Sequence, residues 1–230
     1  MSRAVRVPTR FERDIAIDVT AAGNPQVRLL GNREFDSERL IAYEAGFRVS
    51  PAPAVTGDVA AFYNRYERLR SGEIGAPFLE ADPAPLHLVV PIQLGNDLDG
   101  HTRGVEASVA VQAAPDLVFR ASYSWLDLRL SEEPAEGRDP QHTAWLRATW
   151  DPAPGWSVDA MTRYVSALRT FDVDKYIEAD VRLAWRDAEA GFEAALVGQN
   201  LFRDSHEEFQ SEDQRSEIER GVYLSIRWMR

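Results

Sequence analysis

Apolar and polar side chains alternate along most of the chain between Arg39 and Trp228. Successive side chains of a β-strand point to opposite sides of a sheet, so strict alternation predicts strands with one apolar and one polar face. The segment 175–186 shows the pattern clearly. Its apolar face carries Ile177, Ala179, Val181, Leu183 and Trp185, and its polar face carries Glu178, Asp180, Arg182, Ala184 and Arg186.

The alternation predicts nine strands, at 38–50, 55–68, 102–113, 117–130, 141–151, 156–168, 175–187, 192–201 and 217–230. Short turns at 50–54, 114–116, 151–155 and 187–191 alternate with longer polar loops, the longest being the excursion 69–100. Because the chain reverses direction at each connection, the short turns share one rim and the long loops share the other. This arrangement is typical of outer-membrane β-barrels, whose apolar faces contact lipid and whose polar faces line the interior.

Large aromatic side chains lie near the ends of the predicted apolar faces. Those expected at the short-turn rim are Trp150, Trp156, Trp185, Phe192 and Trp228. Tyr123 and Trp125 lie near the other rim, and Tyr164 follows Trp156 by eight residues on one face, which is roughly 20 Å along a barrel axis. Membrane barrels carry aromatic girdles at both interfaces. We therefore expect these side chains to lie at the membrane interfaces.

The composition fits this interpretation without requiring it. Hydrophobic residues make up 44% and charged residues 27%, values shared by soluble proteins and by barrels, in which only every second strand residue is apolar. No apolar run approaches the ~18 residues of a membrane helix. A net charge of −11 argues against nucleic acid as a partner. The absence of cysteine excludes disulfides and thiol chemistry.

The first residues, 1–14, contain no apolar core of a signal peptide. An outer-membrane protein needs a signal peptide for export. The sequence therefore predicts either that the barrel interpretation is wrong or that the chain is a piece of a longer protein.

Five stretches in the same order resemble the C-terminal half of the barrel of TonB-dependent outer-membrane receptors. They are SRAVRVPTRF at Ser2–Phe11, LLGN at Leu29–Asn32 with Glu38 and YEAGFR at Tyr43–Arg48, AFYNRY at Ala61–Tyr66, GN at Gly95–Asn96 with Gly100 and GVE at Gly104–Glu106, and VGQNL at Val197–Leu201 with His206 and Phe209. Each match is weak alone, but five in register are fairly specific and run across nearly the whole chain.

The resemblance implies an all-β fold: an antiparallel up-and-down transmembrane barrel segment, with about nine to ten strands of a larger 22-stranded barrel. Residues 1–37 correspond to a strand end and an outer loop, and residues 38–230 to the C-terminal part of the barrel. The family's plug domain and TonB-contacting box have no counterpart in the sequence. The family usually ends on an aromatic residue that the barrel-assembly machinery reads, whereas here Met229 and Arg230 follow Trp228.

By resemblance, the function is that of a receptor in the cell outer membrane of a Gram-negative bacterium. It imports a scarce ligand, typically a ferric siderophore, with energy delivered through TonB. The implied partners are TonB, a ferric chelate, the barrel-assembly machinery acting on the C-terminal strand, and outer-membrane lipid with lipopolysaccharide. No enzymatic activity, catalytic residue or cofactor is expected, because the sequence lacks nucleophile-elbow, P-loop, dinucleotide and HExxH motifs. The four histidines show no metal-ligand spacing.

Six arginines are candidates for contact with an anionic ligand. Arg10, Arg13 and Arg33 belong to the predicted first outer loop, and Arg120, Arg163 and Arg182 point to the predicted polar face. The alternative role of the second group is to balance the carboxylates of a wet lumen, or to contact a plug.

Nine strands would leave two edges whose backbone groups cannot face lipid. We therefore expect that the chain alone does not transport and needs further strands or oligomerisation. Two alternatives stay open. A small self-closed barrel with a structural or adhesive role would need a tenth strand from residues 1–37, and a soluble all-β binding protein would bury its apolar faces in a core.

Overall fold

The computed structural model describes residues 1–19, 25–82, 84–131, 137–208 and 217–228. Phe209 of the quoted motif and the terminal pair 229–230 lie outside these residues. The described elements are β1 (Ser2–Arg6), α1 (Arg10–Asp14), β2 (Ala16–Asp18), β3 (Gln26–Leu30), β4 (Glu38–Ala52), β5 (Val55–Ile74), β6 (Phe78–Glu80), β7 (His87–Ala114), β8 (Leu117–Leu130), β9 (His142–Ala153), β10 (Trp156–Val165), the 3-10 helix η2 (Arg169–Phe171), β11 (Tyr176–Asp187), β12 (Phe192–Gln199), β13 (Ser205–Glu207), β14 (Glu217–Glu219) and β15 (Gly221–Trp228).

The main sheet follows the order β1-β4-β5-β7-β8-β9-β10-β11-β12-β15, and the register is antiparallel wherever neighbours along this path are matched residue by residue. This confirms the all-β, up-and-down architecture predicted from the alternation. The sheet is not closed, because within the described parts of the chain no pairing joins β1 to β15. The tenth strand, β1, therefore extends the sheet beside β4 and does not complete a small barrel.

The chain divides into two compact units. The loop unit comprises residues 1–43, 63–101 and 129–133, and the wall unit comprises residues 44–62, 102–128 and 134–230. Each unit has its own packing and its own set of candidate residues.

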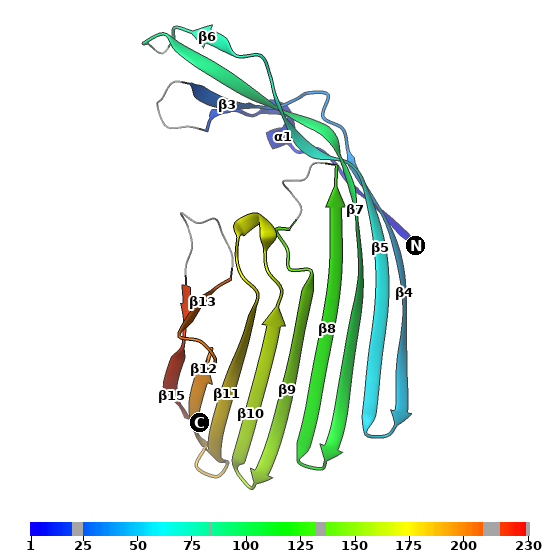
Figure 1. The fold of residues 1–230 in the computed structure, drawn as a ribbon, viewed down its shortest axis with the longest axis vertical. Helices are drawn as coiled ribbons and strands as arrows, with labels where there is room; N and C mark the ends of the chain where they lie inside the picture. Colours follow the sequence, from blue (N-terminus) through cyan, green and yellow to red (C-terminus); the bar gives the residue numbers. More distant parts are fainter. Residues whose placement is uncertain (20–24, 83, 132–136, 209–216, 229–230) are drawn as a thin grey trace. The chain divides into compact units, whose positions relative to one another are not determined.

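In the wall unit, neighbouring strands keep the two faces that the sequence predicts. Trp156, Val158 and Ala160 of β10 are opposite Trp185, Leu183 and Val181 of β11. Strands β9 to β12 lie side by side, with their short connections at one end (Figure 1). Register therefore aligns the apolar faces of neighbouring strands with one another.

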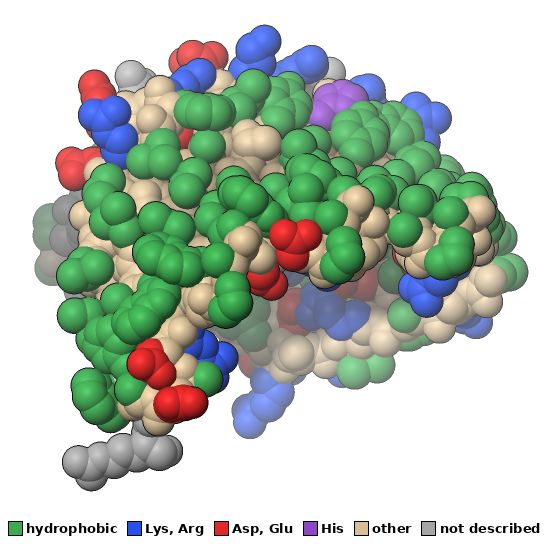
Figure 2. Space-filling model, turned by 90° about the horizontal axis from the view of Figure 1, so that it is seen from below, with side chains coloured by type: hydrophobic (Ala, Val, Ile, Leu, Met, Phe, Trp, Pro, Cys, Tyr) green, Lys and Arg blue, Asp and Glu red, His purple; other side chains and the backbone are tan. Residues whose placement is uncertain are grey.

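The apolar face is open to the surroundings. Val181, Leu183 and Trp185 are 38%, 42% and 38% exposed, and Ile226 of β15 is 63% exposed. Figure 2, seen from below relative to Figure 1, shows many hydrophobic side chains at the surface visible from that side. A soluble sheet would cover such a face with a second layer, as the soluble all-β alternative requires. The open face instead suits contact with acyl chains.

The loop unit differs from the expected long excursion at 69–100. Strand β5 continues to Ile74, and β7 begins at His87. Pro91 does not break β7. Its carbonyl still accepts the Gly75 N–H at 2.9 Å, and proline is tolerated at a strand position whose own backbone N–H is not needed for pairing. Val89 and Leu94 of β7 are buried together with Phe35 in this unit, so burial outweighs the turn signal of the prolines.

Two short strands flank β7 in the loop unit. Strand β3 pairs with β7 in parallel, and β6 pairs with it antiparallel. The Arg28 guanidinium donates to both carboxylate oxygens of Glu80, at 3.0 and 2.7 Å, and to Asp18 at 2.7 Å. This bidentate pair connects the β2–β3 hairpin to β6 and holds the pKa of Glu80 below its ordinary value.

Candidate functional site

A ladder of ion pairs crosses the polar face of the wall unit. Asp159 of β10 accepts from Arg147 of β9 at 2.6 Å and lies 3.7 Å from Arg182 of β11. Arg182 also donates to Glu193 of β12 at 2.7 Å. The alternation places these four side chains on one face, and the register brings them side by side. Arg182 therefore balances carboxylates on both neighbouring strands.

Arg163 occupies a second network near the long-loop end of the same face. Its guanidinium donates to Asp180 at 3.3 Å, to the Asn200 side-chain oxygen at 2.8 Å and to Glu208 at 3.2 Å. Asn200 has a left-handed φ of 54°, and its backbone N–H donates to Asp180 at 2.9 Å. One arginine thus connects the strand wall to the segment that follows β12.

Arg120 has a different setting. It is exposed, and it lies directly opposite Arg147 in the β8–β9 register. Like charges at opposing positions repel. Among the described residues no ion pair is found for Arg120.

The three candidate loop arginines lie in the loop unit. Arg10 and Arg13 are on α1, and Arg33 follows β3; all three are exposed, with the Arg10 side chain 96% accessible. The two segments meet at Gly31, where an added Cβ would lie 2.6 Å from the Arg13 carbonyl carbon. The structure thus brings α1 against the segment carrying Arg33, while Arg120, Arg163 and Arg182 belong to the wall unit.

A buried carboxylate anchors α1. Glu12 accepts from the Thr9 backbone N–H at 2.8 Å, from the Thr9 hydroxyl, and from Arg6 at 2.8 Å. Arg6 also makes a bidentate pair with Glu38, the first residue of β4. The hydrogen bonds from Thr9 and Arg6 lower the pKa of Glu12 from 4.5 to about 2. This anchor fixes the loop that carries Arg10 and Arg13.

We expect the anchor to weaken in acid. A carboxylate with a depressed pKa stabilises the folded state fully above its unfolded pKa, and the contribution is lost as pH falls from about 4.5 to about 2. At pH 7, Glu12→Gln should speed amide hydrogen exchange across residues 7–15 by about 10- to 100-fold, as expected for a lost charged hydrogen bond of roughly 1.5–3 kcal/mol. The difference from the parent should shrink toward pH 2. Glu34→Gln, at an exposed loop carboxylate, is the matched control; a pH-independent difference would contradict the assignment.

The predicted interface aromatics group by rim within the wall unit. Trp156 is opposite Trp185, Phe192 is opposite Trp228, and the ring centroids of Trp185 and Phe192 are 6.2 Å apart. Trp150 lies opposite Leu117 and Val158. Tyr123, Trp125 and Tyr164 lie toward the long-loop ends of their strands, where Tyr123 bonds His142 at 2.8 Å. Their contact with a membrane interface stays a prediction.

Two groups of polar-face residues were missed from the sequence. The first group is Trp145 and Arg147 of β9, and the alternation that places Arg163 on the polar face also places these two residues there. The second group can be found only from the fold. The ring centroids of His206 in β13 and Tyr176 are 4.4 Å apart. His206 Nε2 lies 2.9 Å from Glu208, and its Nδ1 lies 3.6 Å from Glu178. Glu178 is fully buried and His206 nearly so. No sequence spacing links position 178 to position 206.

Across the described ranges, no group of three or more His, Asp or Glu side chains is arranged to hold a metal ion.

No helix in the described part of the chain is both long and apolar enough to cross a membrane.

Comparison with known proteins gives a family match and several similar folds. The family model described as TonB dependent receptor-like, beta-barrel, matches residues 2–201. No curated protein was found to be similar to the chain. Among solved structures, the siderophore receptor PirA from Acinetobacter baumannii is similar with a TM-score of 0.74 and 14% identity, over 97% of this chain and 37% of that one. PirA from Pseudomonas aeruginosa gives 0.68 and 16%, over 97% and 37%.

A third similar structure is a mutant of the ferric enterobactin receptor PfeA from Pseudomonas aeruginosa in complex with enterobactin, with a TM-score of 0.70 and 15% identity, over 97% of this chain and 37% of that one. The chain therefore spans little more than a third of these receptors, and at such identities the likeness shows the fold. The matched family consists of receptors and transporters of the Gram-negative outer membrane rather than enzymes. The chain belongs to the β-barrel family of TonB-dependent receptors.

Proposed function

We propose that the chain forms the C-terminal part of the barrel of a receptor that takes up a ferric siderophore. The observation that carries the proposal is the family match over residues 2–201, on a sheet with one open apolar face and one charged face. The similar solved structures include siderophore receptors and a ferric enterobactin receptor. Exposed arginines in the predicted first outer loop suit an anionic iron chelate.

The proposal assigns different roles to the two groups of arginines. Arg10 and Arg13, which are exposed on α1, together with Arg33 would attract the chelate from solution. Arg163 and Arg182 are held in ion pairs and would keep the lumenal wall rigid and polar. Arg120, beside Arg147, would meet an acidic group of a plug or of the passing ligand.

We further propose that the protein resides in the Gram-negative outer membrane, with its open apolar faces toward lipid. Its aromatic side chains at the two rims would then lie at the two interfaces. Energy would come from TonB acting on the complete receptor, and the barrel-assembly machinery would engage the C-terminal strand. With β1 and β15 unjoined, the chain by itself would not transport, because unpaired backbone groups are costly in lipid.

Binding of ferric enterobactin to the full chain in detergent micelles tests the ligand class. Quenching of tryptophan fluorescence would report the Kd. We expect the double variant Arg10→Glu with Arg13→Glu to raise the Kd at least tenfold through charge reversal. Arg186→Glu with Arg227→Glu makes the same charge change near the short-turn ends of β11 and β15 and should leave the Kd within twofold. Equal effects of both doubles, or no binding at all, would contradict the proposal.

Growth tests the expectation about transport. The chain would be exported with an added signal sequence in a Gram-negative strain without its own ferric enterobactin receptor. We expect no growth on ferric enterobactin as sole iron source. Growth that depends on TonB would show that this chain alone completes a working pore.

A further inference from the structure

A pocket of about 570 Å³, here called the rim pocket, lies at the short-turn rim of the wall unit. It is lined by the turn 151–157, which joins β9 to β10, and by Arg186 of β11 and Glu193 of β12. All these residues belong to the wall unit. The rim pocket therefore lies within one compact part of the chain, and it contains none of the six candidate arginines.

The turn that forms the pocket is bonded to the segments on both of its sides. The Gly155 carbonyl accepts the Arg186 N–H at 2.7 Å, and the Asp116 carbonyl accepts the Asp151 N–H at 2.9 Å. Gly155 has a φ of 80°, which residues with a side chain rarely adopt, and an added Cβ would lie 2.6 Å from the Arg186 carbonyl oxygen. These bonds and the glycine give the pocket a defined shape.

Two exposed charges of opposite sign line the pocket. Asp151 lies on the turn, and Arg186 lies near the end of β11. Among the described residues, neither side chain forms an ion pair or a hydrogen bond. The third charged residue, Glu193, accepts a hydrogen bond from Arg182 at 2.7 Å. The exposed carboxylate and the exposed guanidinium are therefore the charged groups that a bound molecule would meet.

Most of the remaining lining is apolar. The turn contributes Pro152, Ala153, Pro154 and Trp156, and the last of these is 43% exposed. An aromatic side chain beside two prolines offers a surface on which CH₂ groups can pack. An aliphatic chain can thus lie on this part of the pocket while its charged end reaches Asp151 and Arg186.

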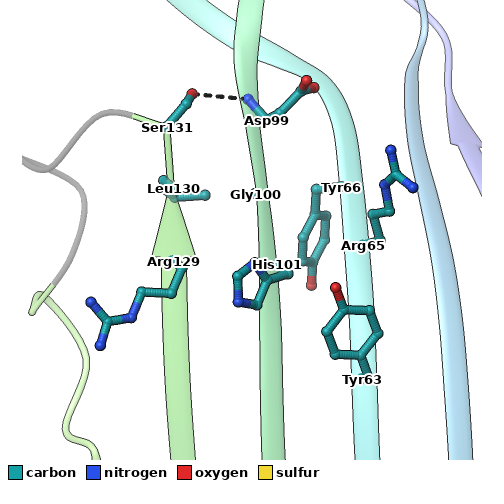
Figure 3. Close-up of a pocket in the computed structure, with 9 residues that line it drawn as sticks. All are labelled: Tyr63, Arg65, Tyr66, Asp99, Gly100, His101, Arg129, Leu130 and Ser131. Carbon is teal, nitrogen blue, oxygen red and sulfur yellow. Dashed lines mark hydrogen bonds between the residues drawn. The ribbon is translucent and has the colours of Figure 1, made fainter.

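A pocket in the loop unit provides a contrast, because it also combines arginines with a carboxylate (Figure 3). Its Asp99 carboxylate accepts the Arg68 backbone N–H at 2.7 Å. Its Arg65 pairs with Glu67 at 3.1 Å, and its Arg129 also has an interaction within the protein. The charges of that pocket are engaged by the chain itself, which distinguishes it from the rim pocket.

A ligand that suits the rim pocket carries one anionic and one cationic group close together. The Arg186 guanidinium can donate two parallel hydrogen bonds to a carboxylate, and the Asp151 carboxylate can accept hydrogen bonds from an ammonium group. A simple anion would be repelled by Asp151, and a simple cation would be repelled by Arg186. An α-amino acid group carries both charges on one carbon and therefore satisfies both residues.

The short-turn rim faces the periplasm in the proposed membrane orientation, and only this step rests on the proposed function. Peptidoglycan in that compartment bears stem peptides with diaminopimelate, whose free end is an α-amino acid group on a short aliphatic chain. We propose that the rim pocket binds this end of a stem peptide. Arg186 holds the carboxylate, Asp151 holds the ammonium group, and Trp156 packs against the aliphatic chain. The contact tethers the barrel wall to the cell wall.

Binding of soluble muropeptides to the full chain in detergent micelles, measured by isothermal titration calorimetry, tests the ligand class. The probes are a disaccharide tetrapeptide with diaminopimelate, the same compound with lysine in its place, and free diaminopimelate. The lysine form keeps the ammonium group and lacks the carboxylate, so we expect its Kd to be about tenfold higher, as for one lost charge-assisted contact. Free diaminopimelate should also bind more weakly, because its second charged end meets the apolar lining.

The outcomes that overturn the proposal are distinct. Equal binding of the two tetrapeptides, or no binding of either, refutes recognition of the α-amino acid group. Free diaminopimelate that binds as tightly as the tetrapeptide refutes the peptidoglycan assignment and indicates a site for a free amino acid. Binding of ferric enterobactin by the parent in the same micelles is measured separately, so that failure of the uptake proposal and failure of this one can be told apart.

Two variants separate the two contacts. Arg186→Gln should raise the Kd of the diaminopimelate form about tenfold and leave that of the lysine form unchanged. Asp151→Asn should weaken both forms to the same extent, because both carry the ammonium group. Arg227→Gln and Glu189→Gln change exposed residues of the same rim outside the pocket and should bind as the parent does. Parent-like binding by both pocket variants refutes the assignment, and if either fails to fold, the comparison of the two tetrapeptides on the parent still decides.

Discussion

Val181→Lys should destabilise the chain in lipid by about 2–4 kcal/mol, the cost of a cation near the middle of the lipid-facing surface of a barrel. Val181 lies on the open apolar face of β11, opposite Ala160. Hydrocarbon offers the ammonium group no hydrogen-bonding partner, and at this depth lysine reaches the interface only at a cost.

Val197→Lys is the matched control. Val197 is one residue from the partner of Val181 in the β11–β12 register, and it lies opposite Arg182 on the polar face. There the new charge meets a wet lumen, and we expect a loss below about 1 kcal/mol from repulsion by Arg182. Urea unfolding in phospholipid vesicles, followed by tryptophan fluorescence, measures both variants. Equal losses would mean that the two faces do not differ in solvent, and the membrane orientation would then be wrong.

His206→Ala should cost about 3 kcal/mol. The ring fills the space beside Tyr176, and its Nε2 lies 2.9 Å from Glu208; truncation loses the packing and the hydrogen bond together. It also leaves Glu178, which is fully buried and 3.6 Å from His206 Nδ1, without its facing imidazole. Glu178 keeps the Phe202 backbone N–H, at 3.1 Å, but it loses a facing group in a buried site, which is costly.

His142→Ala provides the comparison for this second prediction. His142 also contacts a tyrosine, with its Nδ1 2.8 Å from the Tyr123 hydroxyl, but it is only half-buried. We expect a loss of about 1 kcal/mol or less. Thermal unfolding of both variants in the same detergent micelles measures which of them is less stable. A His206 variant as stable as the His142 variant would show that the buried cluster does not stabilise the fold.

Strands of the wall unit could be predicted from the sequence to within a few residues, because lipid on one side and water on the other impose an unbroken two-residue period. The neighbouring segments 176–187 and 192–199 show this, since Leu183 lies opposite Leu196 and Trp185 lies opposite Ala194 on the apolar face. The same period placed Arg163 and Arg182 on the polar face.

The loop unit could not be predicted in this way. Its strands are held by pairings between distant segments, such as β3 beside β7 in parallel, and by ion pairs such as Arg28 with Glu80. Prolines in the segment 77–91 indicated a loop, whereas the burial of Val89 favours a strand. The partners of Arg163 show the same limit: Asp180 follows from strand register, but Glu208 lies beyond β13 and reaches Arg163 only through the tertiary fold.

The two unjoined edges, β1 and β15, have a practical consequence. Within the described chain each presents one side of its backbone to no partner strand, so both sides are templates for hydrogen bonding. A separately synthesised polypeptide that carries the remaining strands of such a receptor could anneal along both seams at once. The chain is thus suited to fragment complementation, in which formation of a closed barrel reports the association of the two fragments.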